Sequence, residues 1–162
     1  MKQETIVILY SYVQREYFSS DQLFFAEAEV EERAHVIRRY LEKIGFVVHV
    51  IPGDDCFIER VKELKPLIVF NLVDSLRGEE YLSSCIPAAL EITNTPYTGT
   101  GQLGLALSTN KFLTNTLLEQ AGVRVPKYQL FTTSKDTINP DLKFPVISKL
   151  NSIHGSIEIN AS

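Results

Sequence analysis

This sequence contains few cysteines and no long hydrophobic run. These two features argue against a disulfide-rich secreted domain and against a membrane-spanning protein. Cys56 and Cys85 are the only cysteines among 162 residues, too few for the disulfide framework of a small secreted domain. We therefore interpret them as buried thiols of a cytoplasmic protein. The longest aliphatic or aromatic runs, such as residues 67–70, are a few residues long, whereas a membrane-spanning helix needs about 20 apolar residues. A secretory signal is not indicated, because Glu4 lies where its basic region would be.

An excess of positive charge is also missing. The 16 Lys and Arg residues face 20 Asp and Glu residues, which gives a formal net charge of −4. A protein that holds a nucleic-acid backbone concentrates positive charge, so we expect neither nucleic acid nor a membrane as a partner. The histidines and cysteines show no metal-ligand spacing, so no metal site is predicted from them. With 44% hydrophobic and 22% charged residues, the composition is that of a globular protein.

Short apolar runs alternate with amphipathic segments over the first part of the chain. Runs at residues 5–10, 46–51 and 67–72 predict strands, and residues 27–44 carry apolar side chains at helical spacing. Gly45 follows, where a left-handed helix end is expected. This β-α-β-α-β order predicts an α/β fold with a doubly wound parallel sheet and helices on both of its faces.

The later elements are predicted from capping residues and prolines. Asp55 is expected to cap a short helix before the third strand. The next helix begins at Ser84 with Pro87 in its first turn, where a missing N–H leaves no hydrogen bond unmade. A short strand is predicted at residues 97–98, and Ser108 or Thr109 is expected to cap the helix that follows.

The pattern changes near residue 125. Strands are predicted at residues 128–132, 144–149 and 157–159, with no helix between them. We therefore place a domain boundary there, with one domain at 1–125 and the start of a second, unfinished domain at 126–162.

Two lysines have settings that suit an anion. Lys111 lies in the first turn of a predicted helix, where the helix dipole already favours negative charge. Lys149 ends a predicted strand and faces a loop with Gly155 and Ser156, whose backbone N–H groups could approach phosphate oxygens. Together they indicate an anion site between the two domains, although each alone is also compatible with a solvated surface charge. The G-x-G-x-x-G match at residues 99–104 follows the fourth strand, not the first, so a dinucleotide site is not favoured.

Several segments occur in an order that resembles one family. They are FNL at residues 70–72, GEE at 78–80, ALEITNTPYTGTG at 89–101, ALSTNKFLTNTLLEQAGVRVP at 106–126 and FPVISKLNSIHGSIEI at 144–159. This order is similar to that of the D-alanine–D-alanine ligase family in the ATP-grasp superfamily. In that family an Asp-Lys pair opens the helix at which this chain has Asn110-Lys111.

The resemblance implies a fold, a reaction and site residues. It implies a flavodoxin- or Rossmann-like pre-ATP-grasp domain followed by the first strands of an ATP-grasp α+β domain. The function would be the N-terminal part of an ATP-dependent carboxylate–amine ligase, inactive by itself, which works through an acyl phosphate with ATP, Mg²⁺ and a small amino-acid-like substrate. Position matching assigns phosphate binding to Lys111, Lys149, His154, Gly155 and Ser156, and substrate binding to Asp74, Gly78 and Glu79. It identifies no catalytic residue and no metal ligand in this chain.

Departures from the family pattern keep alternatives open. Leu150 replaces the usual proline after the lysine, Ile153 replaces a glutamate, Glu158 replaces a glycine, and Asp74 stands where a histidine is usual. These changes are also compatible with a non-catalytic, ligase-derived module for binding or assembly. A stand-alone flavodoxin-like nucleotide binder is a third hypothesis, based on fold analogy alone. A homodimer is left open.

Overall fold

The computed structural model describes residues 3–152. By its internal contacts the chain divides into two compact units, Met1–Leu105 and Ala106–Ser162. Compact units and evolutionary domains are different divisions of a chain, so the boundary at residue 125 stays a prediction.

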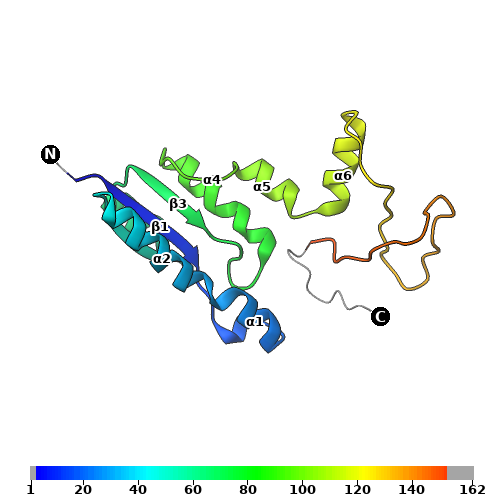
Figure 1. Ribbon diagram of the computed structural model, residues 1–162, viewed down its shortest axis with the longest axis horizontal. Helices are drawn as coiled ribbons and strands as arrows, with labels where there is room; N and C mark the ends of the chain where they lie inside the picture. Colours follow the sequence, from blue (N-terminus) through cyan, green and yellow to red (C-terminus); the bar gives the residue numbers. More distant parts are fainter. Residues whose placement is uncertain (1–2, 153–162) are drawn as a thin grey trace. The chain divides into compact units, whose positions relative to one another are not determined.

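A three-stranded parallel sheet forms the centre of the first unit (Figure 1). Its strands are β1 (Thr5–Ser11), β2 (Val47–Gly53) and β3 (Ile68–Leu72), in the order β2-β1-β3. Val7 of the central strand pairs in parallel with His49 on one side and with Val69 on the other. The three predicted strands and their parallel arrangement are confirmed. β1 is buried at every position from Ile6 to Ser11, as expected for a middle strand covered on both faces.

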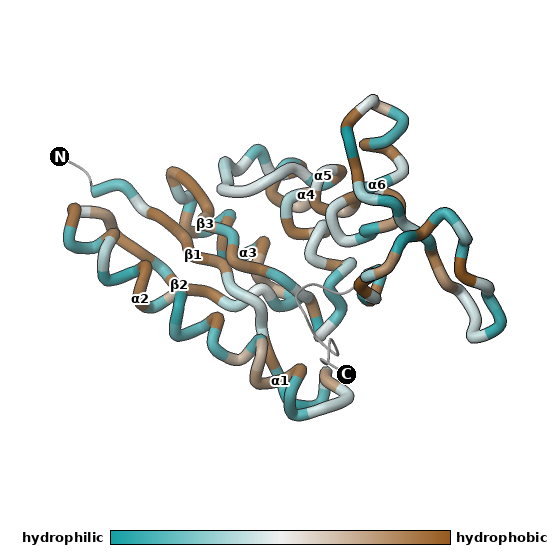
Figure 2. Tube along the Cα trace, turned by 45° about the vertical axis from the view of Figure 1, so that its right-hand side comes forward, coloured by the Kyte–Doolittle hydropathy of each residue, from teal (hydrophilic) through white to brown (hydrophobic). Residues whose placement is uncertain are grey.

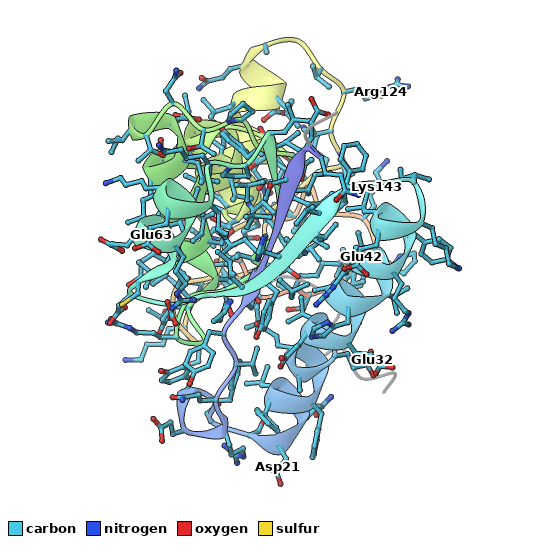
Figure 3. The ribbon with its side chains drawn as sticks, turned by 90° about the vertical axis from the view of Figure 1, so that its left-hand side faces the viewer. Asp21, Glu32, Glu42, Glu63, Arg124 and Lys143 are labelled. Atoms are coloured by element: carbon cyan, nitrogen blue, oxygen red, sulfur yellow. The ribbon has the colours of Figure 1, made fainter. Side chains whose placement is uncertain are left out.

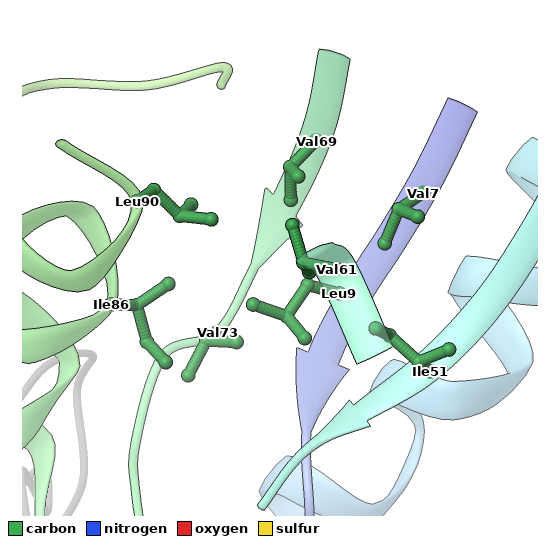
Figure 4. Packing of buried hydrophobic residues seen from close by; sticks show 8 residues of the cluster. All are labelled: Val7, Leu9, Ile51, Val61, Val69, Val73, Ile86 and Leu90. Atoms are coloured by element: carbon green, nitrogen blue, oxygen red, sulfur yellow. The ribbon is translucent and has the colours of Figure 1, made fainter. Parts of the chain in front are cut away.

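Alternate residues of β1 belong to two separate hydrophobic cores, because successive side chains of a strand point to opposite faces. Val7 and Leu9 pack with residues of α3 (Phe57–Leu64) and α4 (Cys85–Ile92), in the cluster of Figure 4. Ile6, Ile8 and Tyr10 pack instead with residues of α2 (Val30–Lys43). Fully burying one such aliphatic side chain contributes about 1.5–3 kcal/mol. The prediction of helices on both faces is confirmed.

Charged side chains lie on the outer faces of these helices. Figure 2 shows hydrophobic residues along β1 and β3 and a mixture along α2. In Figure 3, Glu32 of α2 and Glu63 of α3 point away from the sheet, and Glu42 of α2 is exposed as well. This is the amphipathic arrangement from which the helices were predicted. Within residues 3–152, no helix has the length and apolar character needed to span a membrane.

The helix predicted over residues 27–44 is observed as α2, and the first two residues of the predicted range end a separate helix that precedes it. A 3-10 turn, η1 (Arg15–Tyr17), follows β1 and leads to α1 (Asp21–Ala28), which Glu29 separates from α2. Ser20 caps α1 by accepting a hydrogen bond from the Leu23 N–H at 3.3 Å. The apolar pattern did not indicate α1, because none of its residues is buried. Gly45, with φ at +101°, ends the second helix as predicted.

The structure corrects the cap predicted for α3. Asp54, not Asp55, holds the turn before this helix, because its Oδ1 accepts the Cys56 N–H at 2.9 Å. At α4, Pro87 lies in the first turn as predicted. Ser84, however, makes no capping hydrogen bond. A 3-10 turn, η2 (Glu80–Ser84), runs directly into the helix and its carbonyl groups accept the Cys85 N–H, while the Ser84 hydroxyl donates to the Tyr81 carbonyl.

Two helices follow, α5 (Gln102–Ser108) and α6 (Lys111–Gln120). The cap predicted for α6 at Ser108 or Thr109 is wrong, because Asn110 is the N-cap and its Oδ1 accepts the Leu113 N–H at 2.9 Å. All three side chains are good cap residues, so the backbone path decides which oxygen reaches the N–H group. Gly122 closes α6 with φ at +79°, as predicted.

Residues 121–152 form no helix or strand, so the strands predicted at 128–132 and 144–149 are wrong. A strand is held by ladder hydrogen bonds to a partner strand, and within the described residues the only sheet is that of the first unit. Local side-chain bonds shape this segment instead: Asp136 accepts the backbone N–H groups of Thr132 and Thr133. The strand predicted at residues 157–159 lies outside the described residues.

Both cysteines are exposed, so the prediction that they are buried is wrong. Cys56 lies in the turn before α3, and Cys85 is the first residue of α4. These are ends of elements, where a side chain can face solvent; Cys85 does so although its neighbours Ser84 and Ile86 are buried.

Candidate functional site

The carboxyl end of the parallel sheet carries a set of buried polar groups. β1 ends at Ser11, whose buried Oγ accepts hydrogen bonds from the N–H groups of Asp74 at 2.9 Å and Ser75 at 3.2 Å. The segment after β3 is therefore tied across to the end of β1. In an open sheet of order β2-β1-β3, the connections change direction between β1 and β3, and ligands of such sheets bind at that point.

The exit from β3 is shaped by Asn71 and Thr98. Asn71 Oδ1 accepts the Val73 N–H at 3.1 Å, and the Asn71 N–H donates to Thr98 Oγ1 at 3.1 Å. The strand predicted at residues 97–98 is reduced to one bridge, in which the Thr98 N–H donates to the Val69 carbonyl at 2.9 Å. These bonds direct the chain from β3 toward Asp74.

Asp74, the first predicted substrate residue, is exposed at this edge. Its buried neighbour Ser75 donates from Oγ to a carboxylate oxygen of Glu27 on α1. Glu27 thus brings a half-buried carboxylate to the carboxyl end of the sheet. Sequence reasoning did not single out Glu27 as a site residue, because the two partners are 48 residues apart and no local spacing relates them.

The predicted pair Gly78 and Glu79 forms part of a tight turn. Leu76 and Glu79 exchange two backbone hydrogen bonds, at 3.0 and 3.2 Å. Arg77 and Gly78 between them have φ of +54° and +76°, as in a two-residue turn that needs positive φ at both positions. A Cβ on Gly78 would also lie 2.6 Å from the carbonyl oxygen of Tyr17. Gly78 therefore has a structural role, and it presents Glu79 on the exposed side of the turn.

A cavity of about 430 Å³ lies beside this turn. Two ion pairs border it, Asp54 with Arg60 and Asp55 with Arg77 at 2.6 Å. Burial would raise the pKa of Asp54, but the hydrogen bonds from Arg60 and from the Cys56 N–H outweigh burial and lower it. The lining residues are Tyr12, Tyr17, Gly53, Asp54, Asp55, Cys56, Phe57, Leu76, Arg77 and Leu82. Asp74, Gly78 and Glu79, the three predicted substrate residues, do not line this cavity.

In the second unit, the start of α6 meets the segment that carries Lys149. The Lys111 N–H donates to the carbonyl oxygen of Asn151 at 3.1 Å, and the Phe112 N–H donates to Asn151 Oδ1 at 2.8 Å. With Leu113 bonded to Asn110, the first three N–H groups of the helix are already bonded. An anion would therefore meet this helix start through the ammonium group of Lys111, not through the backbone.

The two predicted phosphate lysines are brought into one neighbourhood. Lys111 Nζ lies 3.5 Å from the carbonyl oxygen of Asn151, and the exposed Lys149 precedes Asn151 by two residues, a span of at most about 7 Å along the chain. The other predicted phosphate residues, His154, Gly155 and Ser156, lie outside the described residues. Within residues 3–152, no group of three or more His, Cys, Asp or Glu side chains could hold a metal ion.

Comparison with known proteins relates the chain to one enzyme family. No family model matches it. It is 27% identical over 114 residues to the D-alanine–D-alanine ligase of Aquifex aeolicus, covering 70% of this chain and 38% of that ligase. It is 29% identical over 142 residues to that of Borrelia duttonii, covering 82% and 37%. An uncharacterized protein y4sG of Sinorhizobium fredii is 37% identical over 117 residues, covering 67% and 34%.

A solved structure agrees in fold. The crystal structure of the D-alanine–D-alanine ligase from Bacillus anthracis complexed with ATP superposes with a TM-score of 0.64, covering 85% of this chain and 41% of that chain at 16% identity. The chain is a distant homologue of the D-alanine–D-alanine ligases. It spans between 34% and 38% of the length of the three relatives above. The resemblance inferred from the motifs is confirmed.

Relation to the D-alanine–D-alanine ligases does not by itself assign the site residues. Asp74, Gly78 and Glu79 lie together at the carboxyl end of the sheet, and Lys111 and Lys149 lie in one neighbourhood of the second unit. Their roles toward substrate and phosphate stay predictions. The contacts of Ser11, Glu27 and Asn151 add three residues that motif comparison with these ligases did not single out.

Proposed function

We propose that the chain is the N-terminal part of an ATP-dependent carboxylate–amine ligase. The observation that carries this proposal is homology to D-alanine–D-alanine ligases over 70% to 82% of the chain. In a reaction of this class, ATP supplies the phosphoryl group that activates a carboxylate for attack by an amine. The relation to a ligase complexed with ATP supports ATP as the nucleotide.

The residues of the second unit fit the phosphate groups of a nucleotide. Lys111 and Lys149 would neutralise phosphate charge, which together with positioning accounts for most of the catalysis of phosphoryl transfer. Lys111 is half-buried, so its contact with an anion is less screened than that of a fully solvated lysine. Residues 3–152 contain no candidate metal cluster, so we assign no magnesium ligand to them.

The residues of the first unit fit the recognition of a small substrate. Asp74 and Glu79 place two exposed carboxylates near the end of β3, and Glu27 adds a third that Ser75 orients. Carboxylates at this edge suit the amino group of an amino-acid-like substrate. Their role would be binding and orientation, because no arrangement of nucleophile and general base is assigned to them.

The test compares ADP formation by the complete protein with that by residues 1–162 alone. The complete protein, supplied with ATP, Mg²⁺ and a panel of D- and L-amino acids, is expected to form ADP in an amino-acid-dependent manner. Residues 1–162 alone are expected to form none above the rate without enzyme. Amino-acid-stimulated ADP formation by residues 1–162 would contradict the proposed division. Failure of the complete protein with every amino acid, together with retained ATP binding, would favour the non-catalytic module.

A further inference from the structure

Asn151 makes a dense set of contacts with the start of α6. Its Oδ1 accepts the Phe112 N–H at 2.8 Å, its backbone oxygen accepts the Lys111 N–H at 3.1 Å, and its Nδ2 donates to Asn110 Oδ1 at 3.1 Å. Asn110 Oδ1 accepts the Leu113 N–H as well. We call the two side chains, Asn110 and Asn151, the asparagine clasp.

The clasp joins two parts of the chain that are otherwise far apart in sequence. Asn151 follows the residues of α6 by 31 to 40 positions, and residues 121–152 contain no helix or strand. No sheet ladder therefore fixes the path of the segment that carries Lys149. Hydrogen bonds across this distance hold it instead: the Asn151 carbonyl accepts the Lys111 N–H, and the clasp adds the two bonds of the Asn151 side chain.

Neutral amides suit this position on electrostatic grounds. Two ammonium groups brought to one phosphate chain repel each other before the phosphate arrives. Hydrogen bonds between amide and backbone groups can oppose this repulsion without adding a negative charge that would repel phosphate. Holding flexible lysine stems in advance also reduces the entropy that binding would otherwise lose.

We propose that Asn151 is a positioning residue, which holds the segment of Lys149 against the start of α6 so that Lys149 and Lys111 meet the same anionic ligand. This rests on the proposed function, since the ligand is taken to be the phosphate chain of ATP. Asn151 acts through the two lysines and makes no phosphate contact itself.

The first experiment measures ATP affinity by titration calorimetry on the complete protein. Asn151→Ala removes the two hydrogen bonds of the Asn151 side chain, to the Phe112 N–H and to Asn110 Oδ1, and is expected to raise the Kd for ATP about tenfold. The matched control is Asn139→Ala, because within residues 3–152 the Asn139 side chain makes a single hydrogen bond, which it accepts from the nearby Asp141 N–H at 2.9 Å. The control is expected to bind ATP like the wild type.

The second experiment separates positioning from a general structural role. If Asn151 acts through Lys111, the two substitutions remove a shared contribution to ATP binding. The loss of binding free energy in the double variant Asn151→Ala/Lys111→Met is then expected to be smaller than the sum of the losses in the two single variants. Hydrogen exchange of the Phe112 N–H, followed by NMR, reports whether the clasp has opened. We expect faster exchange in Asn151→Ala and unchanged exchange in Asn139→Ala.

The outcomes distinguish the two proposals. A wild-type protein that does not bind ATP refutes the function and this inference with it. ATP binding by Asn151→Ala at wild-type affinity, with faster Phe112 exchange, refutes the positioning role alone, and so do fully additive effects in the double variant. Should Asn151→Ala not fold, Asn110→Ala removes the acceptor of the Asn151 amide. Because it also removes the N-cap of α6, the double variant Asn110→Ala/Lys111→Met is then the deciding measurement, with the same expected departure from additivity.

Discussion

Gly78 offers a direct test of whether the turn after β3 is built on a close backbone approach. In Gly78→Ala the new Cβ would lie 2.6 Å from the Tyr17 carbonyl oxygen, a separation that real Cβ atoms do not adopt. The turn or η1 must therefore move by several tenths of an ångström. Overpacking of this kind costs about 1–3 kcal/mol. Alanine at φ of +76° adds about 1 kcal/mol, because a side chain disfavours the left-handed conformation.

Gly45 supplies the matched control for this substitution. It also has positive φ, at +101°, but nothing lies within 4 Å of the Cβ that alanine would add. Gly45→Ala should therefore lose only the backbone contribution, about 1 kcal/mol, whereas Gly78→Ala should lose about 2–4 kcal/mol in total. Both glycines lie in the first compact unit, so the same unfolding transition reports on both.

Urea unfolding of residues 1–162, followed by far-UV circular dichroism, measures both losses. The expected order of the free energy of unfolding is wild type, then Gly45→Ala, then Gly78→Ala. Equal losses in the two variants would show that the approach of Tyr17 to Gly78 does not constrain the turn. In that case glycine would be required at position 78 only for the positive φ of the turn. The inferred steric constraint from Tyr17 of η1 would be wrong.

Two further predictions concern charge. Lys111→Met in the complete protein should weaken ATP binding about 10- to 100-fold, because a charge-assisted contact contributes roughly 1.5–3 kcal/mol. Calorimetry measures the affinity, and thermal melts check that the variant is folded. Unchanged affinity would show that Lys111 is not part of the site. Burial first, and then Glu31, raise the pKa of Tyr10 to about 12, so the neutral phenol is favoured in the folded state. The contribution of the neutral Tyr10 phenol to the free energy of unfolding should be complete below pH 10 and lost as the pH rises toward 12. The free energies of unfolding of wild type and Tyr10→Phe, measured over this range, test this. Parallel pH curves for the two proteins would contradict it.

The strands and the face-covering helices could be predicted because their signals are local. In β1, apolar residues at successive positions require burial on both faces, and a parallel sheet with helices on each face satisfies that requirement. Residues 128–132 and 144–149 carry similar local signals, yet they form no strand. Strand formation depends on a partner, which local composition does not supply.

The candidate site could be predicted only in outline for the same reason. Lys111 and Lys149 were predicted from their positions at the ends of expected elements, although the strand expected to end at Lys149 does not form, and Asp74 was predicted from motif order. The partners that orient these segments could not be found, because Ser75 with Glu27 and Lys111 with Asn151 are contacts across 48 and 40 residues. The predicted caps of α3 and α6 were wrong by one or two residues. Neighbouring residues there have similar capping ability, and the backbone path decides which of them reaches the N–H group.

The asparagine at position 110 bears on whether departures from the ligase pattern weaken phosphate binding. The motif resemblance places Asn110-Lys111 where the family has an Asp-Lys pair. As an N-cap, either side chain offers the oxygen that the Leu113 N–H requires. The same oxygen also accepts the Asn151 amide, and a carboxylate could accept both bonds. The replacement therefore preserves the geometry while removing one negative charge beside Lys111, which strengthens the local positive potential. This departure is therefore compatible with the proposed phosphate binding at the start of α6.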